Sequence, residues 1–115
     1  MSDVIVYEKR TCTTCRKVAD LLRSRGIEYD DVQYHVEGIS EDKIRELLGK
    51  AQISAREALR MREEGAGELA DGASEDEIVA AMAARPELLQ RPIVVRGDRA
   101  VLARPPEKVL ELFDA

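Results

Sequence analysis

Tryptophan is absent from this chain of 115 residues, and phenylalanine occurs only once. A core without large aromatic rings must be built from Val, Ile, Leu, Met and Ala. With so few aromatic side chains, recognition of bases or sugars by stacking is not expected. Hydrophobic residues make up 44% and charged residues 36% of the sequence, which is typical of a folded domain with a charged surface.

The chain also lacks an excess of positive charge. Its formal net charge of -5 at pH 7 repels phosphate backbones, so we expect no nucleic-acid partner. The one local gathering of basic residues comprises Lys9, Arg10, Arg16 and Lys17.

Long apolar runs are missing as well. No segment approaches the roughly 20 residues of a membrane span, and the N-terminus leads directly into a strand pattern without a secretory signal. We therefore expect a cytoplasmic protein with no membrane partner. The length suits one domain over residues 1–115, because two independent cores would not fit, and we expect a monomer.

Only two cysteines and one histidine are present. In a reducing compartment, two cysteines three positions apart, Cys12 and Cys15, indicate redox chemistry or metal binding more than a structural disulfide. A zinc site needs four ligands and only His35 could join the two sulfurs, so we expect no metal. We assign His35 no role. A pair of buried, inert cysteines remains an alternative.

The first third of the chain reads as a strand, a helix and a second strand. Residues 4–7 form an unbroken apolar run, the pattern of a strand covered on both faces. Apolar residues at helical spacing follow the cysteines and predict a helix that ends near Gly26. Alternation over residues 27–34 predicts the second strand. The two cysteines therefore lie where the first helix begins.

Three helices are predicted next, each beginning at a serine that can cap the first turn: Ser40, Ser54 and Ser74. Ser54 with Glu57, and Ser74 with Glu77, match the capping box, in which serine and glutamate each bond the other's amide. Residues 64–73 contain three of the seven glycines and predict an exposed loop.

In the last third of the chain the spacing of the apolar residues again becomes that of strands. Residues 93–95 predict a strand, Gly97-Asp98 a two-residue hairpin turn, and residues 100–102 the returning antiparallel strand. Pro105 and Pro106 suit the first turn of a final helix. This order predicts an α/β thioredoxin-like fold with a helical insertion between the N-terminal βαβ unit and the C-terminal ββα unit.

Cys12 is the predicted nucleophile. A thiol attacks as the thiolate, and helix N-termini and nearby cations both lower its pKa. Cys12 precedes the first helical turn and lies close in sequence to Lys9, Arg10 and Arg16. Cys15 is three residues further on, on the same helix face, and is the predicted resolving thiol.

Pro92 is a candidate structural residue of the active site. Thioredoxin-like folds resemble one another in having a cis-proline at the start of the strand that faces the reactive cysteine, and Arg91-Pro92 before Ile93 occupies that position. The alternative is a trans proline that ends the preceding helix.

Taken together, several segments resemble the ArsC-type arsenate reductases of the ArsC/Spx superfamily. The segments are Cys12 after a strand ending at Tyr7, the stretch 54–60, the run Arg91-Pro92-Ile93-Val94-Val95, and Arg104-Pro105 before the last helix. In that family one cysteine attacks arsenate and three arginines bind the oxyanion. The resemblance therefore implies that Arg60, Arg91 and Arg104 bind substrate. Guanidinium forks suit the task because they pair two oxygens at once and remain charged.

The resemblance also implies reduction of arsenate to arsenite with no bound cofactor. Reducing equivalents would come from glutathione and glutaredoxin or from thioredoxin, which are then the expected partners besides the oxyanion. Two features depart from the family. Glu8, Lys9 and Arg10 replace the usual His and Asn before the cysteine, and Cys15 supplies a second thiol that many members lack.

Two other functions stay open. The Cys-Thr-Thr-Cys-Arg-Lys run is similar to that of the Spx-type branch, whose members bind RNA polymerase and use the thiol pair as a redox switch. A general glutaredoxin-like thiol-disulfide oxidoreductase is the other alternative, with the arginines binding a carboxylate.

Overall fold

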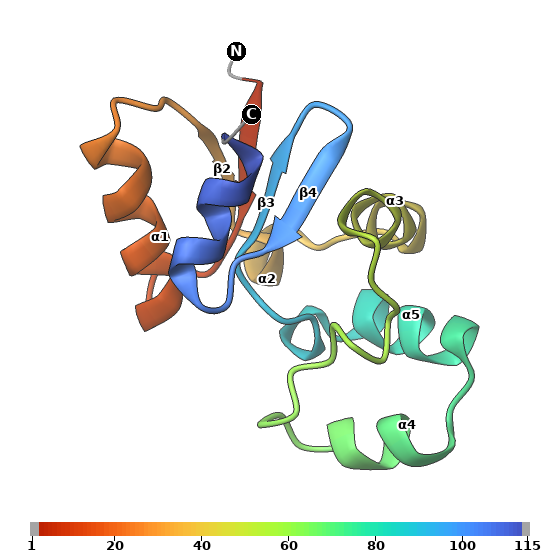
Figure 1. Ribbon diagram of the computed structural model, residues 1–115. Helices are drawn as coiled ribbons and strands as arrows, with labels where there is room; N and C mark the ends of the chain where they lie inside the picture. Colours follow the sequence, from red (N-terminus) through yellow and green to blue (C-terminus); the bar gives the residue numbers. More distant parts are fainter. Residues whose placement is uncertain (1–2, 114–115) are drawn as a thin grey trace.

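The computed structural model describes residues 3–113. A four-stranded sheet is formed by β1 (Val4–Tyr7), β2 (Asp30–Val32), β3 (Ile93–Arg96) and β4 (Arg99–Leu102). Its strand order is β2-β1-β3-β4 (Figure 1). β1 pairs parallel with β2 and antiparallel with β3, and β3 and β4 form the hairpin that Gly97-Asp98 predicts.

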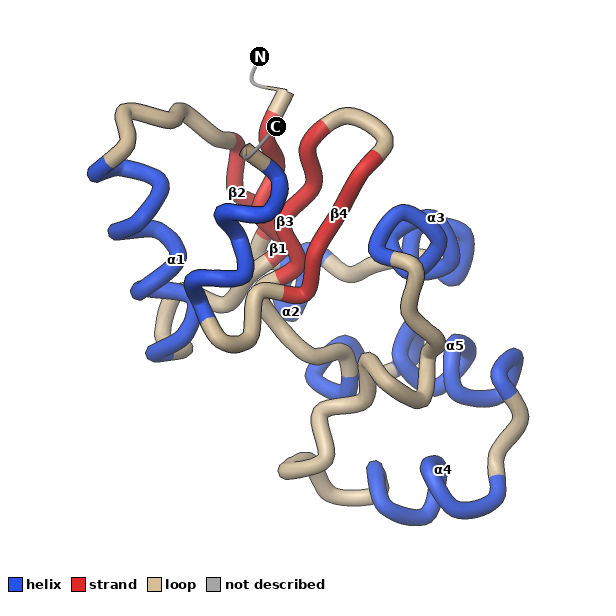
Figure 2. The backbone as a smooth tube through the Cα atoms, viewed as in Figure 1, coloured by secondary structure: helices blue, strands red, loops and turns tan. Residues whose placement is uncertain are grey.

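Helices cover both faces of this sheet. They are α1 (Thr13–Ser24), α2 (Tyr34–Glu37), α3 (Glu41–Ala51), α4 (Ala66–Gly72), α5 (Glu75–Ala84) and the 3-10 helices η1 (Pro86–Leu88) and η2 (Pro106–Leu112). Figure 2 shows α1 and η2 on one side of the strands and the inserted helices on the other. The thioredoxin-like α/β prediction with a helical insertion is confirmed.

Alternation along β1 separates two cores. Val4 and Val6 point toward α1 and η2 and join a buried cluster with Val18 and Leu22. Tyr7 points to the other face and joins the larger cluster beneath the inserted helices. Because successive strand residues face opposite sides, one four-residue strand serves both cores. Among residues 3–113, no helix is long and apolar enough to cross a membrane.

Local signals at three helix ends are confirmed. Ser40 accepts a hydrogen bond from the Lys43 amide at the start of α3, and Ser74 forms a complete capping box with Glu77 at the start of α5. After α1, Gly26 has a φ of 68°, a left-handed conformation that favours glycine.

Besides the helix predicted from Ser54, three predicted elements differ from the structure, and one observed element was not predicted. The strand predicted over 27–34 is only three residues long, and Tyr34 instead begins α2. The loop predicted over 64–73 contains α4, because Ala66 is buried and Leu69 packs against the core. The last helix is a 3-10 helix, and η1 was not predicted.

The helix predicted from Ser54 is a single turn. Both capping-box hydrogen bonds form, between Ser54 and Glu57, at 3.1 Å each. The chain then leaves the helical path, because Leu59 makes an antiparallel bridge with Leu89 and the Arg60 amide donates to the Leu88 carbonyl at 2.8 Å. Pairing with a segment thirty residues away thus overrides the local signal.

Candidate active site

Cys12 is the residue that caps the N-terminus of α1. Its backbone is extended, with φ -76° and ψ 127°, and the first helical residue is Thr13. The Cys12 amide donates to the Lys9 carbonyl at 2.9 Å, and its own carbonyl accepts from the Arg16 amide at 3.0 Å. The turn and the helix therefore fix the sulfur at the end of α1 where amide groups are unpaired.

The environment of Cys12 favours the thiolate. Burial alone would raise the pKa of this thiol, but interactions with the backbone amide and thiol of Cys15 and with the Thr14 amide outweigh it. The charge of Arg91 adds to their effect, and the pKa of Cys12 lies below its ordinary value of 9.0. The thiolate, which is the form that attacks as a nucleophile, is therefore favoured at Cys12 relative to an ordinary cysteine.

Cys15 has the opposite environment. Its side chain is fully buried, and burial raises the pKa of its thiol to about 12. The neighbouring Cys12 and Glu8 charges raise this pKa further. Both cysteines are reduced. The pair thus consists of one reactive thiol and one protonated thiol beside it.

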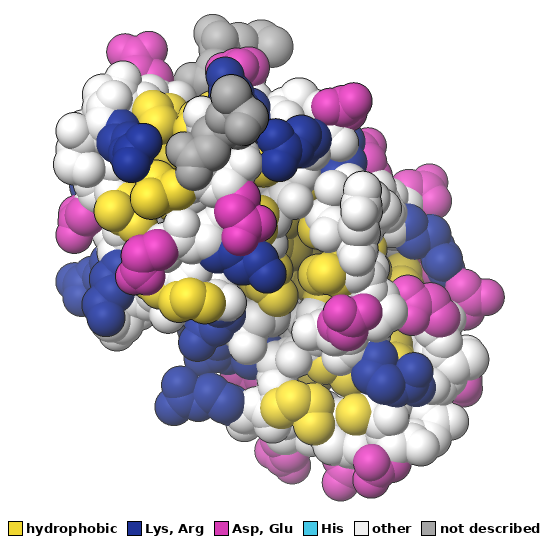
Figure 3. Space-filling model, viewed as in Figure 1, with side chains coloured by type: hydrophobic (Ala, Val, Ile, Leu, Met, Phe, Trp, Pro, Cys, Tyr) yellow, Lys and Arg dark blue, Asp and Glu magenta, His cyan; other side chains and the backbone are white. Residues whose placement is uncertain are grey.

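A cavity of about 220 Å³ lies in front of Cys12. Its lining consists of Thr11, Cys12, Thr13, Thr14, Arg60, Arg62 and Arg104. Two of the three predicted arginines, Arg60 and Arg104, thus share one cavity with the predicted nucleophile. Figure 3 shows Lys and Arg side chains gathered at the hollow between the sheet and the inserted helices. Three guanidinium groups beside a thiolate favour an oxyanion as the occupant.

Arg91, the third predicted arginine, does not line the cavity. The residue is 3% exposed, and its Nη2 lies 3.7 Å from a carboxylate oxygen of Glu87. Its charge nevertheless interacts with Cys12. The Nε atom of Arg91 is buried and makes no hydrogen bond to the residues described, so this face of the guanidinium still has a donor available.

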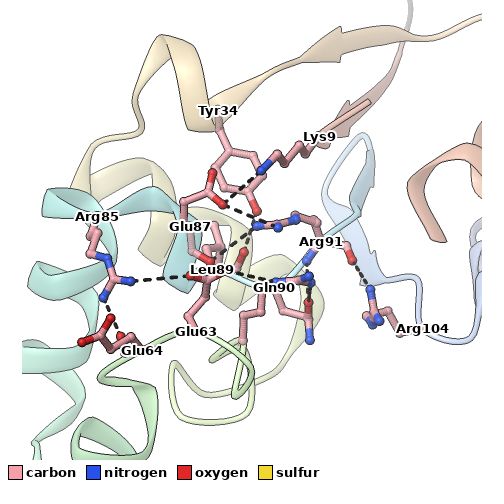
Figure 4. A network of polar contacts seen from close by, with 11 residues as sticks. Lys9, Tyr34, Glu63, Glu64, Arg85, Glu87, Leu89, Gln90, Arg91 and Arg104 are labelled. Carbon is pink, nitrogen blue, oxygen red and sulfur yellow. Dashed lines mark hydrogen bonds and ion pairs between the residues drawn. The ribbon is translucent and has the colours of Figure 1, made fainter. Parts of the chain in front are cut away.

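Hydrogen bonds connect the three arginines (Figure 4). Arg60 donates to the Gln90 side-chain oxygen at 3.0 Å, and the same oxygen accepts from the Arg91 amide at 3.3 Å. Arg104 donates to the Arg91 carbonyl at 2.9 Å. The Tyr34 hydroxyl donates to the Leu89 carbonyl at 2.5 Å and thus fixes the segment before Arg91. The site is therefore pre-organised.

Pro92 is buried at the start of β3, and the Arg91-Pro92 bond is cis. Its carbonyl accepts a hydrogen bond from the Ala103 amide at 3.0 Å. The Arg104-Pro105 bond is also cis, which the sequence did not indicate.

Two of the three nearby cations expected to lower the pKa of Cys12 form ion pairs with other residues. Lys9 pairs with Glu87 at 3.3 Å, and Arg10 pairs with Asp31 at 3.1 Å. Arg91, almost eighty positions away in sequence, is the principal cation that acts on Cys12. Proximity in sequence therefore did not identify the cation that lowers the pKa of Cys12.

Several residues of the site were missed at the sequence level. Arg62 lines the cavity but has no match in the family pattern, while Gln90, Tyr34 and Glu87 position the arginines. Of these residues, only Gln90 could have been identified from sequence, because it directly precedes Arg91-Pro92. Within residues 3–113, no group of three or more His, Cys, Asp or Glu side chains could hold a metal ion.

The chain is similar to known proteins along nearly its whole length. The sequence profile of the ArsC family matches residues 7–112. An arsenate reductase of Escherichia coli is 33% identical over 116 residues, which cover 98% of this chain and 82% of that protein. The uncharacterized protein YfgD of Escherichia coli K12 is 37% identical over 113 residues, with 95% of each chain covered.

A solved structure matches as well. The arsenate reductase from Vibrio cholerae superimposes with a TM-score of 0.87 at 34% sequence identity, over 94% of this chain and 95% of that one.

Proposed function

The chain belongs to the ArsC family, and on this basis we propose that it reduces arsenate to arsenite with Cys12 as the nucleophile. The observation that carries the proposal is the cavity of about 220 Å³ in which Cys12 faces Arg60 and Arg104. A thiolate and fixed guanidinium groups around one small cavity suit a tetrahedral oxyanion.

The arginines have distinct parts in this proposal. Arg60 and Arg104 line the cavity and bind oxyanion oxygens directly. Arg91 stabilises the Cys12 thiolate by its charge, and its free Nε donor is available to an oxygen once substrate enters. Pro92 is a structural residue whose buried position at the start of β3 anchors Arg91.

The reaction has two steps. The Cys12 thiolate attacks arsenic, an S–As bond forms, and one arsenic-bound oxygen leaves as water after taking up two protons. A second thiolate then attacks the Cys12 sulfur. The electron pair of the S–As bond passes to arsenic, which leaves as arsenite, and a disulfide forms. Two thiols are oxidised while arsenic is reduced by two electrons.

Two sources of the second thiol fit these steps. Cys15 lies next to Cys12 and would give an internal disulfide that thioredoxin or glutaredoxin then reduces. Glutathione would instead form a mixed disulfide with Cys12. No bound cofactor and no metal takes part in either route, and the expected partners are arsenate and one of these thiol reductants.

A second candidate is a general thiol-disulfide oxidoreductase. The favourable interaction between the Cys12 sulfur and the Cys15 thiol supports it, because an internal disulfide can form without any oxyanion. Reduction of a mixed disulfide with glutathione, at a rate indifferent to arsenate, would favour this function.

Arsenate-dependent oxidation of NADPH by the purified protein tests the proposal. We expect turnover with a thioredoxin system, with a glutathione and glutaredoxin system, or with both. Replacing arsenate by sulfate should reduce turnover to background, because sulfate has the same tetrahedral shape but is not reduced by thiols. Absence of arsenate-dependent turnover with either system would contradict the proposal.

A further inference from the structure

Glu8 is a carboxylic acid buried at the C-terminal end of β1. The residue is 4% exposed, and its amide continues the β1–β2 ladder by donating to the Val32 carbonyl at 3.0 Å. Since strand side chains alternate, Glu8 shares with Val4 and Val6 the face that α1 covers. The steps proposed above give this carboxyl no part.

Cys15 lies on the face of α1 that packs against the same side of the sheet. Cys15, Val18 and Leu22 follow one another at helical spacing and are all fully buried. Burial, and then the charges of Cys12 and Glu8, disfavour the Cys15 thiolate. The thiol therefore has no direct contact with water that could accept its proton.

Glu8 is buried but borders a solvent-filled groove. It lines an open groove of about 1050 Å³ between α1 and β2. Five charged or titratable groups interact with Glu8: Cys15 and Arg23 from α1, Tyr29 and Asp31 at β2, and Arg10 from the loop before α1. Three further charged residues of α1 line the groove: Arg16, Lys17 and Asp20. Glu8 is thus a buried carboxyl on the same side of the sheet as Cys15, interacts electrostatically with the Cys15 thiol, and also lines the groove.

The acidity of Glu8 suits such a position. Burial raises the pKa of Glu8 from 4.5 to about 7, the Asp31 charge raises it further, and Arg10 and Arg23 lower it. Near neutral pH the carboxyl is therefore divided between its two protonation states, as efficient proton transfer requires.

We propose that Glu8 is the proton acceptor for Cys15 during the resolving step. This inference rests on the proposed function only in that Cys15 resolves a bond on Cys12. The Glu8 carboxylate takes the proton of the Cys15 thiol, and the resulting thiolate attacks the Cys12 sulfur. The Cys12–Cys15 disulfide forms, the group formerly on Cys12 leaves with its electron pair, and Glu8 passes the proton to the groove.

The electrostatics of the intermediate assist this transfer. Once Cys12 carries a leaving group it is no longer a thiolate, so one charge that opposes ionisation of Cys15 is gone. When Glu8 accepts the proton it becomes neutral, and the second opposing charge is gone as well. The two groups therefore exchange one proton at lower cost than either resting pKa implies.

The inference is tested with DTNB, an aromatic disulfide that releases a coloured thiolate, in the absence of arsenate. In stopped flow, attack by Cys12 releases the first thiolate at a rate proportional to DTNB. Attack by Cys15 on the mixed disulfide then releases the second at a rate independent of DTNB. The variants are Glu8→Gln, Glu8→Asp and, as a matched control, Glu28→Gln, which alters an exposed carboxylate of the same groove.

We expect Glu8→Gln to slow the second phase about 100-fold at pH 7.5 and to leave the first phase within about twofold. The wild-type second phase should show an inflection near pH 7 that Glu8→Gln abolishes. Glu8→Asp should recover part of the rate, and Glu28→Gln should match the wild type. A structural role alone would not move the inflection.

Three results would overturn the inference: a wild-type second phase that is absent or has no inflection between pH 6 and 8, an unchanged second phase in Glu8→Gln, or equal slowing of both phases. If a variant fails to fold, the pH dependence of the second phase in the wild type still tests the role of Glu8. Because the DTNB experiment contains no arsenate, any of these three results would contradict the role of Glu8 but not the reduction of arsenate. Conversely, absence of arsenate turnover would not affect the DTNB result.

Discussion

Arg104 donates a hydrogen bond of 2.9 Å from its Nη1 to the backbone carbonyl oxygen of Arg91. Arg91 precedes β3 and Arg104 follows β4, so the β-hairpin brings the two together. One end of the Arg104 guanidinium is thereby fixed to the backbone, while the side chain lines the cavity in front of Cys12. A planar fork can make both contacts at once, and a lysine ammonium cannot orient itself in this way.

We therefore expect Arg104→Lys to lower kcat/KM for arsenate by about 10- to 100-fold although the charge is kept. Steady-state kinetics with the coupled NADPH assay measures it. Arg99→Lys is the control, because Arg99 also donates to a backbone carbonyl, that of Glu111, from the exposed end of β4. Equal kinetics of the wild type and Arg104→Lys would exclude a bidentate role for Arg104.

Tyr34→Phe should destabilise the protein. The buried Tyr34 hydroxyl satisfies the Leu89 carbonyl, and its removal leaves that acceptor without this donor inside the core. The expected loss is about 1–3 kcal/mol in the free energy of unfolding, measured by urea denaturation. Tyr29→Phe, at a partly exposed tyrosine, serves as control. If Tyr34→Phe lowers the free energy of unfolding by less than Tyr29→Phe does, the hydrogen bond from Tyr34 to Leu89 does not stabilise the fold.

The elements that were predictable from sequence are those set by local chemistry. The apolar run at Val4–Tyr7 and the capping box of Ser74 with Glu77 both gave the correct element. Segment 54–60 carries an equally good capping box but forms one turn, because the bridge between Leu59 and Leu89 is a tertiary contact. Periodicity cannot register a partner thirty residues away.

The candidate site follows the same division. The family pattern brought out Cys12, Arg60 and Arg104, which line one cavity in the structure. That Arg91, and not Lys9, is the principal cation acting on Cys12 depends on the fold, which brings together two segments far apart in the chain. Glu8 is another example. Strand alternation assigns it to one face of the sheet, but the sequence does not show that α1 covers that face.

Glu8→Gln should change how stability depends on pH. The pKa of Glu8 is raised in the folded state to about 7 from 4.5, so the folded state favours the protonated carboxyl. This stabilisation is full below pH 4.5 and is lost as pH rises through 7. The wild type should therefore lose up to about 3 kcal/mol relative to Glu8→Gln between pH 4.5 and 8.

Urea denaturation of both proteins across this pH range measures the difference. Glu28→Gln again provides the control, since Glu28 lies exposed on the same groove. Parallel stability curves for the wild type and Glu8→Gln would contradict a raised pKa of Glu8.

Cys15→Ala should make Cys12 less acidic. The Cys15 thiol is among the groups that stabilise the Cys12 thiolate, and its loss raises the pKa of Cys12. Alkylation by iodoacetamide, followed by mass spectrometry as a function of pH, should show a shift of the Cys12 profile to higher pH. In the wild type only Cys12 should react near neutral pH, because burial raises the pKa of Cys15 to about 12. Faster alkylation of Cys15 than of Cys12 would reverse the proposed assignment.

The proposed reaction depends on attack of the Cys12 sulfur on arsenate. The decisive measurement is arsenate-dependent NADPH oxidation by Cys12→Ser, made beside Cys15→Ser and the wild type. We expect background turnover for Cys12→Ser with every reductant, and turnover for Cys15→Ser only where glutathione can supply the second thiol. Undiminished turnover in Cys12→Ser would show that Cys12 is not the nucleophile.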